Sequence, residues 1–221
     1  MDAAAAFLFA RAVNYIRDKA AVSSILKLDA IDALEIHTSG SHLGKFKELW
    51  DGLGKGVENL KLVAVSLPYS GDATVPSMKK MYSIMMPELP CYNLWQLDGR
   101  PMSGDIGRGA SKELISFAAH VANSKDRPPG FYQVAGGSNA HTVAGLQKEG
   151  LYGGKVEEDP FIGGLGFGSY ARKIVGRVLR SVPSENGAFR LEDHPEHLLE
   201  AVVEALRLVG TVKCYAGSLP W

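Results

Sequence analysis

Cysteine is scarce in this sequence, and its two cysteines, Cys91 and Cys214, lie far apart. A disulfide framework or a zinc site needs several closely spaced cysteine or histidine ligands, and an iron–sulfur cluster is normally held by four thiolates. The cysteines of this chain cannot by themselves ligate such a cluster, and we predict no metal site. We interpret Cys91, which opens a predicted strand, as a buried structural residue.

An excess of charge of one sign is also missing, because 24 basic residues balance 24 acidic ones. Without a net field or a basic stripe, the sequence favours neither nucleic acid nor an anionic membrane as a partner. No apolar run approaches the ~18 residues of a membrane span, and the alanine-rich start makes a poor targeting peptide. We therefore expect a soluble protein, in the cytoplasm, or in the chloroplast if the source is a plant.

What the sequence does contain is an alternation of strand and helix patterns in a chain long enough for one domain. Residues 1–9 remain unassigned, and 10–221 form one α/β domain. We expect strands at 10–16, 33–38, 61–67 and 91–97, and in the short runs before Gly136 and Gly166. Helices are expected at 18–29, 43–53, 75–86 and 112–122, and beginning near Tyr170 and Pro195. We assign the methionines of 75–86 to the core.

This order predicts parallel strands with crossover helices. It resembles the C-terminal five to six units of a (β/α)8 TIM-type barrel, whose closure needs eight strands. The barrel is therefore incomplete in this chain. Either another segment pairs with it, or it closes as a smaller open sheet.

Two glycine-rich turns, each between a predicted strand and a predicted helix, are the most distinctive local pattern. In a (β/α)8 barrel, the loops after the last two strands form the usual phosphate site, and glycine lets the backbone approach an anion. Arg172 lies in the first turn of the following helix, where a cation opposes the helix dipole unless an anion compensates. The alternative is two ordinary strand–helix connections. The predicted phosphate- or cofactor-binding residues are Gly136, Gly137, Ser138, Asn139, Gly166, Gly168, Ser169 and Arg172.

Polar residues also gather where the predicted strands end. Side chains of one parity share a face of a strand, so such residues from neighbouring strands can converge, and barrel chemistry occurs at these ends. The loop after 91–97 adds further acids and an arginine. We predict a pocket lined by Glu35, His37, Gln96, Asp98, Arg100, Ser103, Asp105, Gln133 and His141.

Three of these residues are candidates for catalysis. Arg100 can clamp a carboxylate or phosphate through two hydrogen bonds, and Asp98 or His37 can move a proton if its pKa is suitable. Each also has a structural alternative. Asp98 begins a common Asp-Gly turn, Arg100 can pair with a neighbouring acid, and a histidine at a strand end is often only hydrogen-bonded structure. His141 can contact a ligand or cap the next helix.

The motifs DALEIHTSG, LKLVAVS, LWQLDGRPMSGDIGRGAS, YQVAGGSNAHTV and GLGFGSYARK occur in this order. Over roughly residues 10–210 the chain resembles the C-terminal domain of the LdpA, or light-dependent period, family of photosynthetic organisms. The resemblance implies a regulatory protein that couples redox state to circadian timing and associates with clock-input components. Full-length members carry a 4Fe-4S-type ferredoxin-like segment ahead of this region. The cluster cysteines and that N-terminal portion are absent here.

Three functions are therefore open. The first, which we favour, is a non-enzymatic redox or circadian-input domain with a phosphate- or cofactor-binding pocket. The second is a fragment of a TIM-barrel-type oxidoreductase that binds FMN, NADP or another phosphate-bearing cofactor. The third is an interaction module that docks onto a protein partner or onto the missing N-terminal half.

Overall fold

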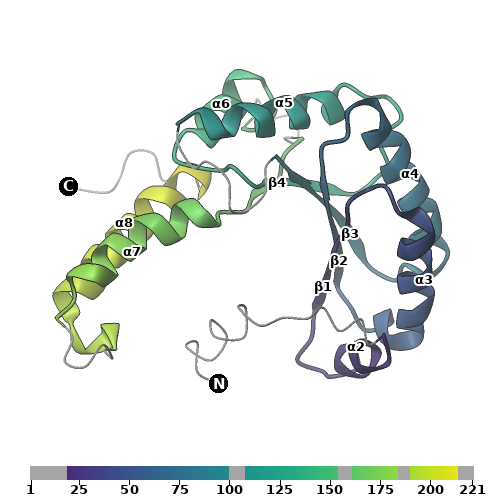
Figure 1. Ribbon diagram of the computed structural model, residues 1–221, viewed down its shortest axis with the longest axis horizontal. Helices are drawn as coiled ribbons and strands as arrows, with labels where there is room; N and C mark the ends of the chain where they lie inside the picture. Colours follow the sequence, from purple (N-terminus) through teal and green to yellow (C-terminus); the bar gives the residue numbers. More distant parts are fainter. Residues whose placement is uncertain (1–18, 100–107, 154–160, 184–189, 214–221) are drawn as a thin grey trace.

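The computed structural model describes residues 19–99, 108–153, 161–183 and 190–213. Its centre is one parallel five-stranded sheet in which the strands follow one another in chain order (Figure 1). The strands are β1 (Ala33–His37), β2 (Leu62–Pro68), β3 (Tyr92–Asp98), β4 (Phe131–Ala135) and β5 (Gly164–Leu165). The sheet is open, with β1 and β5 as the two outer strands of the described part.

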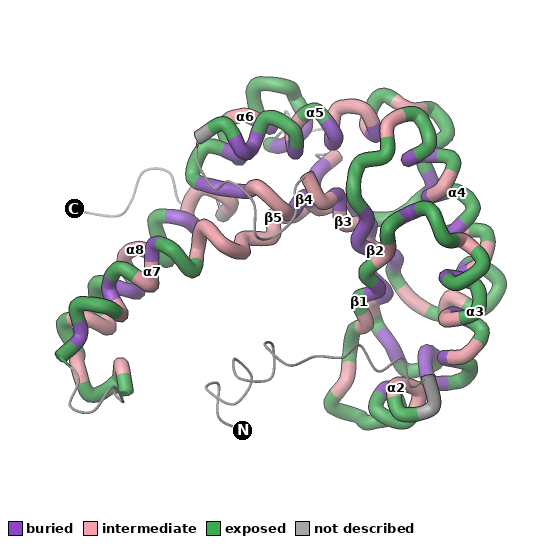
Figure 2. Tube along the Cα trace, viewed as in Figure 1, coloured by how far each residue is buried: buried purple, intermediate pink, exposed green. Residues whose placement is uncertain are grey.

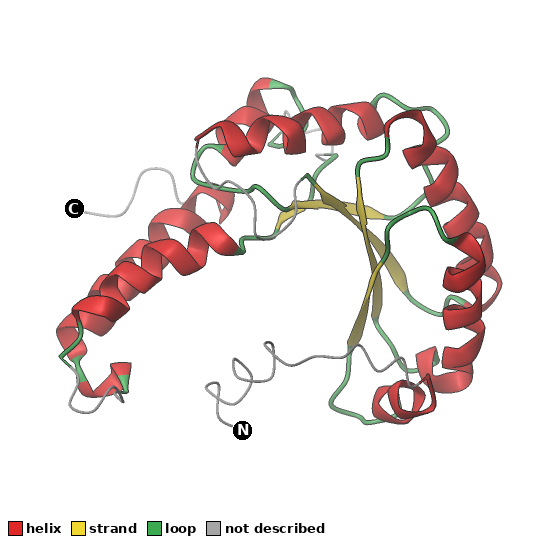
Figure 3. Ribbon diagram, in the orientation of Figure 1, coloured by secondary structure: helices red, strands yellow, loops and turns green. Residues whose placement is uncertain are grey.

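The crossover helices lie on one face of this sheet (Figure 3). Right-handed crossovers between consecutive parallel strands always return on the same side, so a sequential strand order produces a one-sided layer. These helices are α3 (Leu43–Leu53), α4 (Thr74–Met85), α5 (Ser111–Ala122) and α6 (Thr142–Lys148), and α2 (Lys19–Leu26), which precedes β1, packs beside α3. The units of a (β/α) barrel have this arrangement, with the opposite face of the sheet pointing inward.

The core lies between the sheet and these helices. Val63, Val65 and Leu67 of β2 and Trp95 and Leu97 of β3 alternate along their strands and are completely or almost completely buried. From the helix side, Met78, Met81, Met85, Leu114 and Phe117 are equally buried. The prediction that the methionines of 75–86 fill the core is confirmed for these three and wrong for Met86, which is exposed where the helix ends. The burial pattern in Figure 2 follows this interface.

A helical hairpin follows β5 and extends away from that end of the sheet (Figure 1). It consists of α7 (Ser169–Ser181) and α8 (Pro195–Lys213), which pack on each other. Ile174 and Val178 are buried on α7, and Arg177 reaches Glu204 of α8 at 4.0 Å. The Tyr152 hydroxyl donates to the carbonyl oxygen of Val212 at 2.5 Å, which joins the hairpin to the rest of the domain. No described helix has the length and apolarity needed to cross a membrane.

The structure confirms the predicted α/β class and the parallel sheet with connecting helices. The helix predicted at 43–53 has these bounds and the last helix begins at Pro195 as predicted, while the other predicted helices are shifted by one or a few residues. The run before Gly166 forms a strand of only two residues. The strand predicted at 10–16 lies outside the described residues.

Candidate functional site

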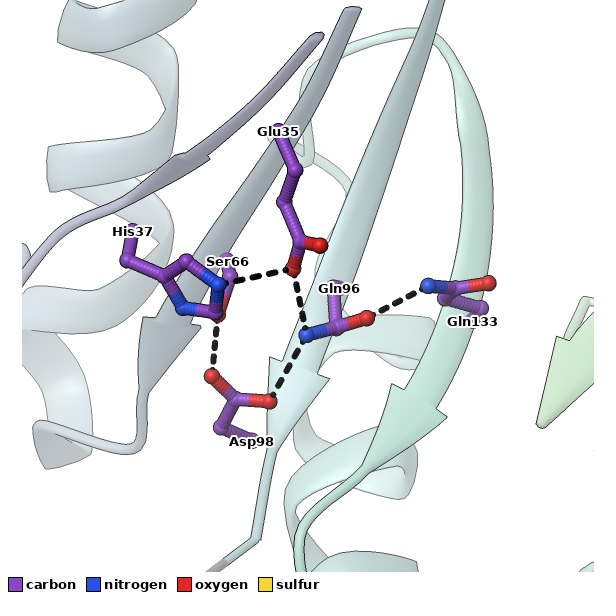
Figure 4. Close-up of polar contacts among 6 residues, drawn as sticks. All are labelled: Glu35, His37, Ser66, Gln96, Asp98 and Gln133. Carbon is purple, nitrogen blue, oxygen red and sulfur yellow. Dashed lines mark hydrogen bonds and ion pairs between the residues drawn. The ribbon is translucent and has the colours of Figure 1, made fainter. Parts of the chain in front are cut away.

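The face of the sheet without crossover helices carries a polar row near the carboxyl ends of its strands. The register places His37 of β1 beside Ser66 of β2, Ser66 beside Gln96 of β3, and Gln96 beside Gln133 of β4. Glu35 lies two residues before His37 and Asp98 two residues after Gln96, on the same face. Figure 4 shows these side chains, which we call the polar network: Glu35, His37, Ser66, Gln96, Asp98 and Gln133.

Gln96 is the centre of the polar network. Its Nε2 donates to Oε1 of Glu35 at 2.9 Å and to Oδ1 of Asp98 at 3.2 Å. Its Oε1 accepts a hydrogen bond from Nε2 of Gln133 at 2.5 Å. Since carboxylates only accept hydrogen bonds and an amide both donates and accepts, these contacts fix the orientation of both glutamines.

The two carboxylates of the polar network differ in their surroundings. Glu35 is 3.3 Å from Nε2 of His37, and both side chains are well exposed. Asp98 is half-buried and accepts a hydrogen bond from the Ser66 hydroxyl. Burial raises the pKa of the Asp98 carboxyl above its ordinary value, while the hydrogen bond from Ser66 and the nearby His37 act against this rise. A carboxyl with a raised pKa next to a histidine is suited to exchanging a proton.

The two glycine-rich loops lie next to each other at the carboxyl ends of the strands, the same end of the sheet as the polar network. The Ser138 hydroxyl donates to the carbonyl oxygen of Gly166, and the Gly166 amide donates to the carbonyl oxygen of Val134 at 2.8 Å. Gly137 has a φ of 91°, and a Cβ there would lie 2.7 Å from the carbonyl oxygen of Ala110. Gly137 therefore allows the loop to approach the backbone of the short turn that precedes α5, which is a structural reason for this glycine.

Asn139 is almost completely buried in the first loop and supports it from within. Its Oδ1 accepts a hydrogen bond from the amide of His141 at 2.9 Å, and its own amide donates to the Thr142 hydroxyl at 2.9 Å. His141 is exposed at the N-cap position of the short helix α6. The His141 side chain makes no capping hydrogen bond to α6, so the alternative that it caps this helix is wrong, and its contact with a ligand stays a prediction.

The second loop leads into α7, whose first turn contains no acidic residue. Arg172 is exposed, and its Nη2 donates to the Ser169 hydroxyl at 3.1 Å on the same turn. Lys173 beside it is also exposed. Two cations at the positive end of a helix dipole are unfavourable without an anion, so this turn is electrostatically suited to a phosphate.

Five of the six members of the polar network were predicted from the sequence, and the structure brings these five into contact through hydrogen bonds or ion pairs. Ser66 was missed. It is the one polar residue of an otherwise apolar run, and its parity and its position near the strand end were the available signal. Arg100, Ser103 and Asp105 lie outside the described residues. Whether any predicted residue binds a ligand stays a prediction.

A hollow of about 840 Å3 lies elsewhere, on the outer side between α4 and α5, and is lined by Lys79, Lys80 and His120 among others. It contains none of the predicted site residues. In it, Lys79 pairs with Asp126 at 3.2 Å, so part of its charge is already compensated. Among the described residues, no group of three or more histidine, cysteine, aspartate or glutamate residues is placed to hold a metal ion.

Comparison with known proteins identifies the relatives of this chain. The profile described as "Light dependent period A C-terminal domain" matches residues 25–211. This chain belongs to the Light dependent period A family. It is 36% identical over 188 residues to "Light dependent period A" of Synechococcus elongatus (strain ATCC 33912 / PCC 7942 / FACHB-805), a match that covers 85% of this chain. The resemblance inferred from the motifs is thereby confirmed.

The chain spans about half, 51%, of the length of this Light dependent period A protein. No solved structure matches the chain significantly. The iron–sulfur cluster that the family resemblance implies does not fit the residues present here. Cys91 is partly buried, burial raises the pKa of its thiol, and the sequence holds one other cysteine. Thiolate ligation of a cluster needs more cysteines than this chain supplies.

Proposed function

We propose that this chain is a non-enzymatic regulatory domain for light or redox input to circadian timing, which acts by binding a phosphate-bearing small molecule at the carboxyl ends of its strands. The observation that carries this proposal is the polar network, which joins four strands directly beside the two glycine-rich loops. Membership of the Light dependent period A family supports the regulatory role.

At the carboxyl ends of the strands, the start of α7 and the polar network suit different parts of one ligand. The start of α7, with Arg172 in its first turn and Lys173 directly after it, offers backbone amides and cations, which suit a phosphate. The polar network is rich in acceptors, since Glu35 and Asp98 are carboxylates and the Gln96 amide is occupied by them. It therefore suits a hydrogen-bond donor on the ligand, such as the ring N–H of a flavin or the amide of a nicotinamide.

A thermal-shift screen against FMN, NADP, NAD and inorganic phosphate tests this proposal. A ligand at 100 times its Kd adds about 2.7 kcal/mol to the free energy of unfolding. We expect stabilisation by a phosphate-bearing ligand, a loss of most of it in Arg172→Ala, and no loss in Arg180→Ala, which removes an exposed arginine from the other end of α7. Glu35→Gln tests the polar network in the same screen.

If none of these ligands stabilises the protein, ligand binding at the carboxyl ends of the strands is contradicted. Equal loss in Arg172→Ala and Arg180→Ala would also contradict it, because it would indicate a general effect of charge. Gly137→Asp is unsuitable as a probe, because a side chain at Gly137 collides with the backbone of Ala110 whether or not an anion binds.

The oxidoreductase alternative is favoured by one observation, the raised pKa of Asp98 next to His37. It predicts that the chain oxidises NADPH in the presence of FMN and an electron acceptor, and that Asp98→Asn slows this turnover. A ligand that binds without turnover favours the regulatory function.

A further inference from the structure

The amino-terminal half of the helix-free face is apolar and uncovered among the described residues. Tyr92 is 68% exposed and Phe131 is 57% exposed, and their rings meet edge to face with centroids 5.6 Å apart. In register beside them lie Leu62, next to Tyr92, and Leu94, next to Phe131. Folded monomers rarely expose contiguous apolar patches of this kind, and such patches mark interaction surfaces. We call these four residues the apolar row.

β1 is an outer strand of the sheet, and its side away from β2 is unpaired within the described part of the chain. The amide of Thr38 donates to the carbonyl oxygen of Ser66 on β2. Because successive backbone groups of a strand point to opposite sides, the amides of Glu35 and His37 point to the other edge, away from β2. Unpaired edges of this kind are templates for a further strand.

The length of the relative indicates what covers these surfaces. This chain spans 51% of the Synechococcus elongatus protein, and its match is to the C-terminal domain of the family. The remaining half of a full-length member therefore lies ahead of this domain. Consecutive β/α units add neighbouring strands in chain order, so strands that precede β1 in the polypeptide pair with its outer edge.

We propose that the apolar row and the outer edge of β1 form the docking surface for the N-terminal half of the family's polypeptide, which adds parallel strands and turns the helix-free face into a barrel interior. Five strands lie in the described part of the chain, a sixth is predicted from the sequence at 10–16, and a (β/α)8 barrel has eight. At roughly 30 residues per β/α unit, the two or three further units that closure needs fit within the half of the relative that precedes this domain. The polar network then lies at the mouth of the barrel, and this surface is distinct from the ligand site proposed above.

Co-expression tests the proposal. The N-terminal half of the Synechococcus elongatus protein is expressed with this chain, and separately fused ahead of it in one polypeptide. We expect a one-to-one complex by size exclusion with light scattering. We expect Tyr92→Glu and Phe131→Glu each to weaken it at least about tenfold, the change typical of a central interface residue. The matched control is Leu199→Glu, because Leu199 is 64% exposed on α8, away from the sheet.

Because the side chains of Tyr92 and Phe131 are exposed in this domain, we expect both glutamate variants to fold. The melting temperature of each isolated variant checks this. Hydrogen exchange provides the second measurement. In the complex and in the fusion, the amides of Glu35 and His37 should gain protection through new pairing at β1.

Several results would overturn the proposal. One is no complex in trans together with no added protection of β1 in the fusion. Another is a complex that the two glutamate variants leave intact, or one that Leu199→Glu weakens equally. A homodimer of this chain alone that the two variants abolish would show that a second copy, rather than the N-terminal half, covers the face.

Discussion

The hydroxyl of Ser138 donates a hydrogen bond to the carbonyl oxygen of Gly166, and this contact joins the loop after β4 to the loop after β5. Since β5 is only two residues long, backbone pairing alone holds this part of the chain weakly. The Ser138 side chain, 4% exposed, therefore acts as a clamp on the loop that leads into α7.

Ser138→Ala should lower the free energy of unfolding by about 1 kcal/mol, since it leaves the half-buried Gly166 carbonyl without this donor. It should also speed hydrogen exchange of the Gly166 amide, which bonds to Val134. Ser83→Ala is the control, because the Ser83 hydroxyl also donates to a backbone carbonyl but lies exposed on α4. Equal exchange at Gly166 in wild type and variant would mean that the clamp is not needed.

Gly137→Ala should destabilise the protein by roughly 2–3 kcal/mol, as judged from urea denaturation. Two effects add here, a φ of 91° and a Cβ placed 2.7 Å from the Ala110 carbonyl oxygen. Substitution of Gly40 separates the backbone effect from the steric effect, because Gly40 has a φ of 73° but nothing lies within 4 Å of a Cβ there. Gly40→Ala should cost about 1 kcal/mol, and equal losses at the two positions would exclude a steric role for the Ala110 contact.

Asp98→Asn should change how stability depends on pH. The pKa of Asp98 is raised mainly by burial, so the folded state holds the proton more tightly than the unfolded chain. Its contribution to folding is present below the unfolded pKa, roughly 4, and is lost as pH rises through the folded pKa. Asparagine has no such loss, so the variant should gain stability relative to wild type as pH rises from about 3 to about 7.

Urea unfolding across that pH range measures this effect. Asp51→Asn, which removes an exposed carboxylate paired with Lys47, is the matched control. Parallel pH profiles for wild type and Asp98→Asn would contradict the burial of the Asp98 carboxyl.

Met78→Ala should lower the free energy of unfolding by about 2–5 kcal/mol, because Met78 is fully buried between α4 and the sheet and its truncation leaves a cavity. Met86→Ala should change it by less than about 0.5 kcal/mol, because Met86 is 56% exposed at the end of the same segment. Comparable losses at the two positions would contradict the packing of α4 described above.

Much of this fold follows from local sequence patterns. The apolar runs of β2 and β3 and the helical spacing of Phe46, Trp50 and Leu53 report burial directly, so these elements were predicted to within a residue or two. Glu35, His37, Gln96, Asp98 and Gln133 were grouped correctly because alternation along parallel strands puts residues of one parity on one face.

Other features depend on contacts between distant segments and were not predictable locally. Ser66 was missed because its neighbours read as a fully buried strand, and its contact with Asp98 depends on the register of β2 and β3. The shortness of β5 and the clamp between Ser138 and Gly166 likewise depend on how β4 positions the following loop. The glycine pattern did not show that Gly137 serves a close contact with the short turn that precedes α5.

The hydrogen bonds around Gln96 have a direction. Nε2 of Gln96 donates to Glu35 and Asp98, so its Oε1 is the atom that accepts a hydrogen bond from Nε2 of Gln133. The amide oxygen of Gln133 then lies on the side of Gly164 of β5. Glu35 accepts from Nε2 of Gln96 whatever the protonation state of Asp98, so the orientation of both amides persists and the Gln133 end of the row stays an acceptor. The polar network therefore presents a fixed hydrogen-bond acceptor on the β5 side of the sheet.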